Sequence, residues 1–255
     1  MTKTSNNWTS PSSASRASST SHFIATIPLK KYSLLVLLTI LLKLDGSRAT
    51  IACGPNNSDE CIALQALYDS YVGSTGCSSS EDTTPVLPLC TYWGTTNYSS
   101  PSYCVWYGIT CSGDDIVHVN LEDNNIEGSI PTEIGLLTDL TYINHASNEI
   151  TGRLPSEVGF LESLTTFRLN SNAFSRAIPT ELGHLTKMQS YFLLGEGINS
   201  DDSSGFSSTI PTELGLLSEM TRSFDLKSNK LTGSMPTELG AFSMLERNFD
   251  ISSNS

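Results

Sequence analysis

Apolar and polar positions follow a short pattern that recurs along the second half of the chain. The first copy, IVHVNLEDNNIEGSIPTEIGLLTDLT, occupies residues 116–141, and similar stretches begin at Leu140 and Leu164. Its opening alternates apolar with polar residues, which predicts a short strand with Val119 and Leu121 pointing inward. Each copy is too short to bury this apolar side by itself, so neighbouring copies must cover it.

The copies follow one another at a nearly constant period. An Ile/Leu/Met–Pro step recurs at intervals of 24, 24, 32 and 25 residues. The prolines of this step are Pro131, Pro155, Pro179, Pro211 and Pro236. A fixed period predicts a solenoid of stacked coils. We assign the extra residues of the long interval to a flexible loop within 195–206, where Gly, Ser and Asp dominate.

One copy reads L-x-x-N-x-I-x-G at Leu121, Asn124, Ile126 and Gly128, and continues as G-x-I-P-x-E-[IVL]-G-x-L. This string resembles the plant-type leucine-rich repeat of plant receptor-kinase ectodomains and of polygalacturonase-inhibiting proteins. The resemblance covers roughly residues 59–255. It implies an α/β solenoid: a right-handed superhelix of short parallel strands, with an irregular or 3-10 convex side and a disulfide-bonded N-terminal cap.

The chain is expected to divide into three parts. Residues 1–52 form a leader, residues 53–115 the N-terminal cap, and residues 116–255 five repeats with an incomplete sixth. The cap should contain a helix that starts at Asp59 and ends before Gly73. Its expected apolar face consists of Leu64, Leu67, Tyr68 and Tyr71.

Several polar residues occupy special places in the repeat. Asn124 is expected to turn into the stack and bond backbone groups that the turn leaves unpaired. Its equivalents are Asn148, Asn172, Asn229 and Asn254. His145 stands at a Leu position, which predicts a partly buried imidazole bonded to a backbone group, or alternatively a pH sensor. Arg176 stands where other copies have a glycine such as Gly128, which we expect to allow a turn that a Cβ opposes.

Residues 1–52 have the features of a targeting segment. Lys30 and Lys31 precede the apolar run YSLLVLLTILL at 32–42, and small residues follow it. A basic flank, a short apolar run and a cleavage region of small residues are typical of a cleaved secretory signal. A membrane span, in contrast, takes about 20 apolar residues. The long Ser/Thr-rich lead leaves two alternatives, a type II membrane anchor through residues 32–44 and organelle targeting.

The net charge of the chain is −12. Residues 1–52 hold six Lys/Arg against one acidic residue, so the remainder carries about −17. This balance argues against nucleic acid or anionic lipid as a partner. Solubility is its simplest explanation, with a cationic ligand or calcium-rich surroundings as alternatives.

All six cysteines lie between the leader and the first repeat, which predicts disulfides rather than a metal site, because no C-x-x-C occurs. The string C-x-W-x-G-[IV]-x-C resembles the capping motif of plant-type repeat proteins, and that resemblance implies the pair Cys104–Cys111. Among the fifteen arrangements that six cysteines permit, we choose Cys53–Cys61 and Cys77–Cys90 for the others. The sequons at Asn56 and Asn97 are candidate glycosylation sites of a secreted chain.

No stretch of the sequence carries a recognisable catalytic set. No G-x-S-x-G string, phosphate-binding loop or G-x-G-x-x-G occurs. Glu196, Asp201 and Asp202 lack the remainder of a calcium loop, so we expect a solvated acidic loop, with calcium as the alternative. The sequence predicts neither a cofactor nor a metal ion nor an enzymatic activity.

The concave sheet is the expected working surface. Phe192 and Leu194 are apolar residues that the repeat pattern places toward solvent, as in interaction sites. The alternative is a different register in this repeat, which would turn both side chains inward. The candidate ligand-binding residues are Tyr142, Asn144, Arg168, Asn170, Phe192, Leu194, Asp225 and Lys227.

The resemblance implies a secreted or cell-surface recognition protein that binds a protein, peptide or glycan on this face. The alternative is a secreted inhibitor of a cell-wall-degrading enzyme. Because the sequence stops inside a repeat at Ser255, we expect a fragment of a longer receptor-like protein. Membrane contact is expected through an uncleaved leader or a missing C-terminal part.

Overall fold

The computed structural model describes residues 59–72, 103–195 and 204–255. All of them lie in one compact unit, Tyr32–Ser255. Several predicted features fall outside the described residues: the leader, Cys53, Cys77, Cys90, Asn56, Asn97 and the acidic loop with Glu196, Asp201 and Asp202. Within the described ranges, no helix has the length and apolar character needed to cross a membrane.

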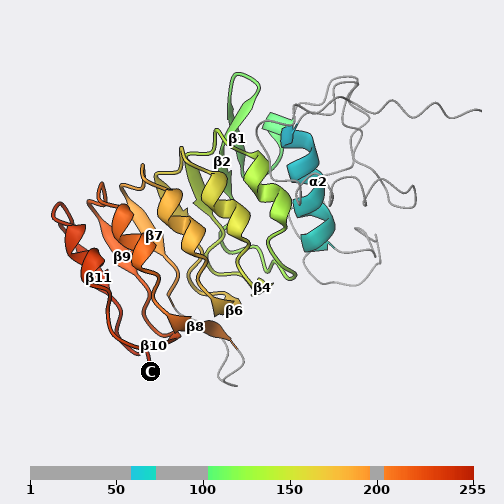
Figure 1. Cartoon of the computed structure of the whole chain (residues 1–255). Coiled ribbons are helices and arrows are strands. Elements are labelled where there is room, and N and C mark those ends of the chain that lie inside the picture. Colours follow the sequence, from blue (N-terminus) through green and yellow to red (C-terminus); the bar gives the residue numbers. More distant parts are fainter. Residues whose placement is uncertain (1–58, 73–102, 196–203) are drawn as a thin grey trace, which may run out of the picture. The chain divides into compact units, whose positions relative to one another are not determined.

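The cap helix predicted from the sequence is confirmed as α2, Asp59–Val72 (Figure 1). Two acidic residues occupy its first turn, where the helix dipole favours negative charge. Of its expected apolar face, Leu64, Leu67 and Tyr71 are buried, whereas Tyr68 is only half-buried. Because α2 packs beside η2 (Thr132–Leu136), it covers the apolar end of the first coil.

The first side of the stack is a seven-stranded sheet in the order β1-β2-β3-β5-β7-β9-β11. Its strands are β1 (Ile109–Ser112), β2 (Asp115–Asn120), β3 (Tyr142–Asn144), β5 (Thr166–Arg168), β7 (Tyr191–Leu193), β9 (Ser223–Asp225) and β11 (Asn248–Asp250). β1 and β2 are antiparallel, and all the other neighbours are parallel. The parallel succession of strands confirms the predicted solenoid.

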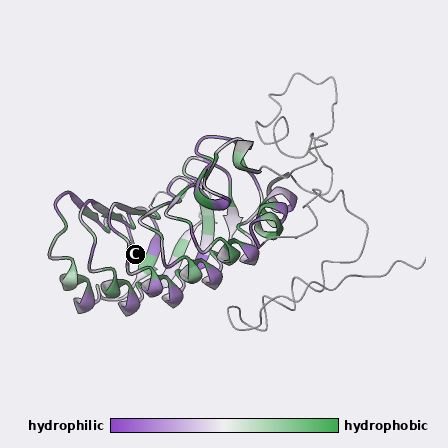
Figure 2. Cartoon of the chain, turned by 90° about the horizontal axis from the view of Figure 1, so that it is seen from above, coloured by the Kyte–Doolittle hydropathy of each residue, from purple (hydrophilic) through white to green (hydrophobic). Residues whose placement is uncertain are grey.

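A row of 3-10 helices forms the second side, with hydrophilic and hydrophobic residues alternating around them (Figure 2). After η2 they are η3 (Ser156–Phe160), η4 (Thr180–His184), η5 (Thr212–Leu216) and η6 (Thr237–Ala241). Each helix begins directly after one of the repeated prolines. The fixed φ of proline suits that place, and its missing N–H is not needed there.

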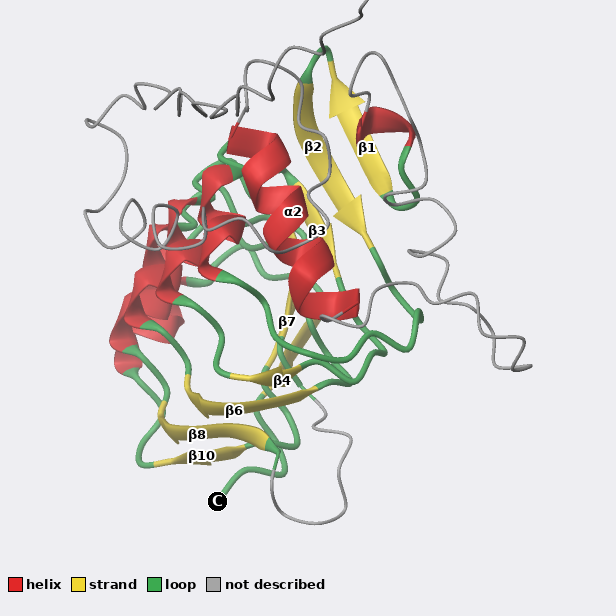
Figure 3. Ribbon diagram, turned by 90° about the vertical axis from the view of Figure 1, so that its right-hand side faces the viewer, coloured by secondary structure: helices red, strands yellow, loops and turns green. Residues whose placement is uncertain are grey.

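A second, four-stranded parallel sheet forms the third side of the coils (Figure 3). In the order of the sheet, its strands are β10 (Lys230–Thr232), β8 (Gly205–Thr209), β6 (Ala173–Ala177) and β4 (Thr151–Gly152). The side chains that the three sides turn inward form the core, and its largest fully buried members are Phe167, Phe192, Phe206 and Phe224.

Neighbouring 3-10 helices approach each other closely at a glycine. A Cβ on Gly159 would lie 2.4 Å from the carbonyl oxygen of Glu181 in the next coil. Gly135, Gly183 and Gly215 have the same relation to the following coil. The stacking distance therefore requires the glycine of the G-x-L step, and the regular glutamate column is the surface that it packs against.

The predicted role of the repeated asparagine is confirmed. Asn148 Oδ1 accepts hydrogen bonds from the N–H groups of Asn124 and Ile126 in the preceding coil, both at 3.0 Å. Its Nδ2 donates to the carbonyl oxygen of Leu121 at 2.8 Å. Asn172, Asn229 and Asn254 bridge to the preceding coil in the same way. Each of these asparagine side chains pairs backbone groups that would otherwise be buried without a hydrogen bond. An unpaired buried group costs about 1–3 kcal/mol of stability.

Left-handed backbone recurs at the turn where the motif has glycine. Gly128, Gly152 and Gly233 have φ values of 95°, 81° and 81°. Arg176 adopts 75° at the equivalent place. A residue with a Cβ is strained there by about 1 kcal/mol, so this coil keeps the turn without the glycine that favours it.

The prediction that Phe192 and Leu194 face solvent is wrong. Their exposed fractions are 0% and 3%. The ring of Phe192 lies between those of Phe167 and Phe224, with centroids 6.0 and 5.2 Å away. The register alternative is therefore the correct one for this coil.

One extra residue before β7 causes this difference. Leu164 and Phe167 are both buried and three positions apart, whereas Met188 and Phe192 are both buried and four positions apart. Because strand side chains alternate between faces, one added residue exchanges the inward and outward sets. Tyr191 therefore takes the outward place at the start of β7.

The insertion between β7 and β8 leaves the path of the solenoid unchanged. The core resumes at Phe206, which is buried and stacks on Phe174 with centroids 5.7 Å apart. The N–H of Phe206 donates to Asn229 Oδ1 at 2.8 Å, as Ile126 does to Asn148. The next asparagine therefore bridges to the chain on the far side of the insertion.

His145 is fully buried, and neither of its ring nitrogens has a hydrogen-bond partner. The expected bond to a backbone group is therefore wrong. Tyr71 of α2 lies edge-on to the imidazole at 5.8 Å, and its buried hydroxyl has no partner either. Burial lowers the pKa of His145 to about 4, because the apolar surroundings penalise the charged ring.

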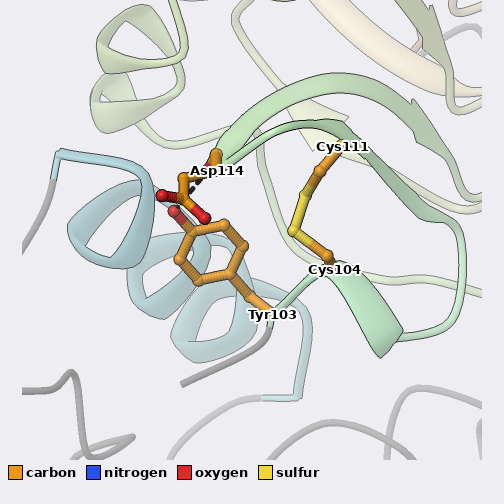
Figure 4. The surroundings of a disulfide bond; sticks show 4 residues. All are labelled: Tyr103, Cys104, Cys111 and Asp114. Atoms are coloured by element: carbon orange, nitrogen blue, oxygen red, sulfur yellow. Dashed lines mark hydrogen bonds between the residues drawn. A yellow bond between two sulfur atoms is a disulfide. The ribbon is translucent and has the colours of Figure 1, made fainter. Parts of the chain in front are cut away.

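The predicted disulfide Cys104–Cys111 is confirmed, with Cα atoms 5.5 Å apart (Figure 4). It joins η1 (Tyr103–Val105) to β1. The hydroxyl of Tyr103 donates to the carbonyl oxygen of Asp114 at 2.8 Å and closes the same hairpin. Cys61 is also disulfide-bonded. The pairs Cys53–Cys61 and Cys77–Cys90 stay predictions.

Candidate ligand-binding face

The solvent side of strands β2 to β11, here called the outer face, carries regular columns of side chains because residues one coil apart are paired. The first column is His118, Tyr142, Thr166, Tyr191, Ser223 and Asn248, and the second is Asn120, Asn144, Arg168, Leu193, Asp225 and Asp250. Of the predicted ligand-binding residues, Tyr142, Asn144, Arg168 and Asp225 stand in these columns. Asn170 and Lys227 lie two residues beyond the ends of β5 and β9.

The N-terminal part of the outer face holds its own polar groups together. Asn144 Nδ2 donates to Glu122 Oε2 at 2.7 Å and to the Tyr142 hydroxyl at 3.3 Å. Its Oδ1 accepts from the N–H of Ala146 at 3.1 Å. The exposed fraction of Asn144 is 0%, so it positions Tyr142 and Glu122 rather than offering a surface of its own. The ring of His118 lies 5.4 Å from that of Tyr142.

The charges of three arginines act on Tyr191 in the middle of the face, and two of these arginines contact its ring. The guanidinium carbon of Arg168 lies 5.5 Å from the ring centroid of Tyr191, and that of Arg222 lies at 5.8 Å. Arg222 Nη1 also donates to the Tyr191 hydroxyl at 3.5 Å. Arg247 comes from the next coil, and its charge acts on the same phenol. We call Arg168, Tyr191, Arg222 and Arg247 the Arg–Tyr cluster.

The charges of this cluster change the acidity of its phenol. The hydrogen bond from Arg222 lowers the pKa of Tyr191, against the opposing effect of desolvation. The positive charges of Arg222, Arg247 and Arg168 lower it further. A site that favours the anionic form of a phenol also favours other anions placed among the same guanidinium groups.

Carboxylates border the Arg–Tyr cluster on both sides. Glu122 Oε1 lies 4.0 Å from Arg168 Nη2. On the other side, Asp225 Oδ1 accepts from the N–H of Lys227 at 2.9 Å. Asp250 accepts from the N–H and the hydroxyl of Ser252, and these bonds lower its pKa. The cluster is thus a cationic island within an acidic surface.

Sequence reasoning missed Tyr191, Leu193, Arg222 and Arg247. It placed Tyr191 and Leu193 inward because it did not recognise the extra residue of this coil. The signal was available: the buried residues Met220 and Phe224 of the following coil have the same four-residue spacing as Met188 and Phe192. Arg222 and Arg247 occupy that extra position, just before β9 and β11.

A shallow hollow of about 250 Å³ lies outside the outer face, at the turns that follow the strands. It is lined by Asp123, Asn125, Ser147, Asn148, Glu149 and Ser171. Several of these residues have left-handed backbone, so the hollow is a crease between successive turns. Over the described ranges, no three His, Cys, Asp or Glu side chains are grouped so that they could hold a metal ion.

Comparison with known proteins agrees with this architecture. Residues 115–137 match the family described as Leucine Rich Repeat. A 44-residue stretch is 46% identical to the LRR receptor-like serine/threonine-protein kinase GSO2 of Arabidopsis thaliana. That match covers 17% of this chain and 4% of the relative, so the chain spans a small part of the relative's length.

Solved structures extend the likeness to most of the chain. The BIR3–SERK2 complex from Arabidopsis thaliana contains a chain of 25% identity and TM-score 0.57, with 76% of this chain and 92% of that chain covered. The BIR2 ectodomain from the same plant has 21% identity and TM-score 0.55, with coverages of 75% and 90%. A plant ice-binding protein has 22% identity and TM-score 0.58, with coverages of 78% and 57%. The described part of this chain is therefore a leucine-rich-repeat solenoid that resembles the ectodomains of plant receptor kinases.

Proposed function

We propose that this chain is a non-catalytic recognition protein of the cell exterior that binds a protein or peptide on its outer face. The observation that carries the proposal is the row of outward residues Tyr142, Arg168, Tyr191 and Leu193 on consecutive parallel strands. Tyrosine and arginine are the side chains most often found at the centres of protein interfaces. The similar chain in the BIR3–SERK2 structure is part of a protein complex.

A rigid support for these side chains favours binding. The asparagine bridges and the stacked phenylalanines hold each coil against the next. A preformed face loses little conformational freedom when a ligand arrives, so more of the contact energy remains as affinity. A long peptide or an extended loop suits such a face, because it can contact several coils at once.

The described histidines offer no base beside a nucleophile. His118 packs against the ring of Tyr142, and His145 is buried without a partner. His184 is exposed at the end of η4, on the opposite side from the outer face. These positions support a binding role rather than catalysis.

The proposal is tested by capture of extracellular proteins and peptides on the immobilised chain. Tyr142→Ala and Tyr191→Ala are each expected to weaken a specific interaction by about tenfold or more, as for central interface tyrosines. Tyr107→Ala is the matched control, because Tyr107 is exposed in the cap hairpin, before β2. Equal binding by wild type and by both face variants would contradict the proposal.

A panel of cell-wall-degrading enzymes separates the alternative function from a receptor-like one. An inhibitor would lower the activity of one of these enzymes in proportion to the complex formed. A receptor-like protein would bind without that effect.

A further inference from the structure

The Arg–Tyr cluster differs in charge from the rest of the molecule. The chain carries a net charge of −12, yet the guanidinium groups of Arg168 and Arg222 lie over the ring of Tyr191, and the charge of Arg247 acts on the same phenol. Like charges repel, so such a gathering is stabilised only when something compensates it. Tyr191 compensates in part, because its ring face and its hydroxyl oxygen both attract the guanidinium groups.

The carboxylates near the cluster leave most of its positive charge available. Glu122 approaches only Arg168, and only at 4.0 Å. Asp225 and Asp250 are held by backbone N–H groups of Lys227 and Ser252. Arg222 and Arg247 are exposed to solvent. Their donors can therefore reach an incoming anion without first breaking a buried contact.

We propose that the Arg–Tyr cluster binds the isolated carboxylate of an acidic side chain in a peptide, flanked by neutral residues. This inference rests on the proposed function and specifies the chemistry of its ligand. A planar guanidinium group binds a carboxylate through two parallel N–H···O bonds. The tyrosine ring adds a flat apolar surface for the peptide next to the carboxylate.

The flanking carboxylates favour a ligand with a single negative charge over a polyanion. Glu122 follows β2, two coils before Arg168, and Asp225 and Asp250 lie in the coils after Tyr191. Neighbouring strands are about 4.8 Å apart, and charges interact over about 8 Å at physiological salt. A polyanion such as a polyuronate or a nucleic acid would place its further charges against these carboxylates, whereas a single carboxylate meets only the arginines.

The test compares two pools of short peptides on the full chain. Their centre is fixed as Asp in one pool and as Asn in the other, and the flanks of both are drawn from Gly, Ser, Ala, Leu and Tyr. Both ends of every peptide are blocked, so the central Asp is the only carboxylate. Wild type is expected to retain the Asp pool roughly tenfold better than the Asn pool at low salt, as a charge-assisted bidentate bond allows. Arg222→Gln and Arg247→Gln should each reduce this preference to about twofold or less.

Arg153→Gln is the matched control, because Arg153 is exposed beside β4 and distant from the outer face. Its preference for the Asp pool should equal that of wild type. Equal retention of the two pools, with loss of both in Tyr142→Ala, would overturn this inference and leave the proposed function standing. An Asp preference that survives Arg222→Gln and Arg247→Gln, or stronger retention of an oligouronate than of the Asp pool, would also overturn it.

Discussion

A buried histidine without a partner makes the stability of this solenoid depend on pH. His145 stands where the repeat has leucine, and its imidazole meets the ring of Tyr71. Neither ring nitrogen has a hydrogen-bond partner, so folding removes this imidazole from water without replacing its hydrogen bonds. The consensus leucine would fill a similar space without that cost.

Because burial lowers the pKa of His145 to about 4, the unfolded chain binds the proton more readily than the folded chain does. The stability that belongs to neutral His145 is therefore complete above about pH 6.5 and is lost as pH falls toward 4. We expect this one group to remove roughly 2–3 kcal/mol of unfolding free energy between pH 7.5 and 4.5. Urea unfolding at the two pH values measures it.

The control for this prediction is His145→Leu, which should be more stable than wild type and should lose less stability on acidification. Carboxylates elsewhere contribute equally to both chains, so the difference between the two pH profiles isolates His145. Parallel profiles would mean that the imidazole is protonated inside the fold or is reached by water.

At the scale of the element, one glycine in each 3-10 helix sets how closely the coils stack. Gly159 packs against Glu181, with 2.4 Å between its ideal Cβ position and the carbonyl oxygen. Gly240 has the same place in η6, but a Cβ there would meet nothing within 4 Å. The same substitution therefore has opposite consequences at the two positions.

Gly159→Ala is expected to cost about 1–3 kcal/mol, because backbone must move apart to admit the methyl group. Gly240→Ala should change stability by less than about 0.5 kcal/mol, or raise it slightly by restricting the unfolded chain. Thermal unfolding of the two variants measures the difference. A similar loss in both would show that helix propensity, rather than the stacking contact, determines the cost.

The repeated elements could be predicted from the sequence, because each local signal recurs and each recurrence supports the others. The asparagine bridge follows from a side chain that can donate and accept at once, and its place in the motif fixes its partners. β7 could not be placed so easily, because Phe192, Leu193 and Leu194 are all apolar and give no alternation. Only the position of Phe192 among neighbouring phenylalanines decides which of them point inward.

The same ambiguity affected the prediction of the candidate site from the sequence. Tyr142 and Arg168 lie in coils of regular spacing, and the sequence placed both on the outer face. Arg222 and Arg247 precede their strands, and their approach to Tyr191 depends on the path of the extra residue. A clustering of charges across three coils is a tertiary property that no single repeat encodes.

At the scale of the whole molecule, a solenoid transmits a local disturbance only to neighbouring coils. The contact between α2 and the first coil tests this, because Ser70 bonds to the backbone of Ser129. An ideal Cβ on Gly128 would lie 2.2 Å from the carbonyl oxygen of Ser70. Gly128→Ala therefore pushes the cap helix away from the stack.

Gly152→Ala is the matched control, because Gly152 also has a positive φ, of 81°, but its added methyl group would stay 3.5 Å from Ser129. Both variants carry the strain of the left-handed backbone, and only Gly128→Ala adds the clash with α2. In hydrogen exchange, amides of α2 should exchange at least about tenfold faster in Gly128→Ala, as a loss of about 1.4 kcal/mol gives, while amides of β9 stay unchanged. Equal acceleration along the whole chain would mean that cap and repeats unfold as one cooperative unit, and faster α2 exchange in both variants would assign the effect to backbone strain alone.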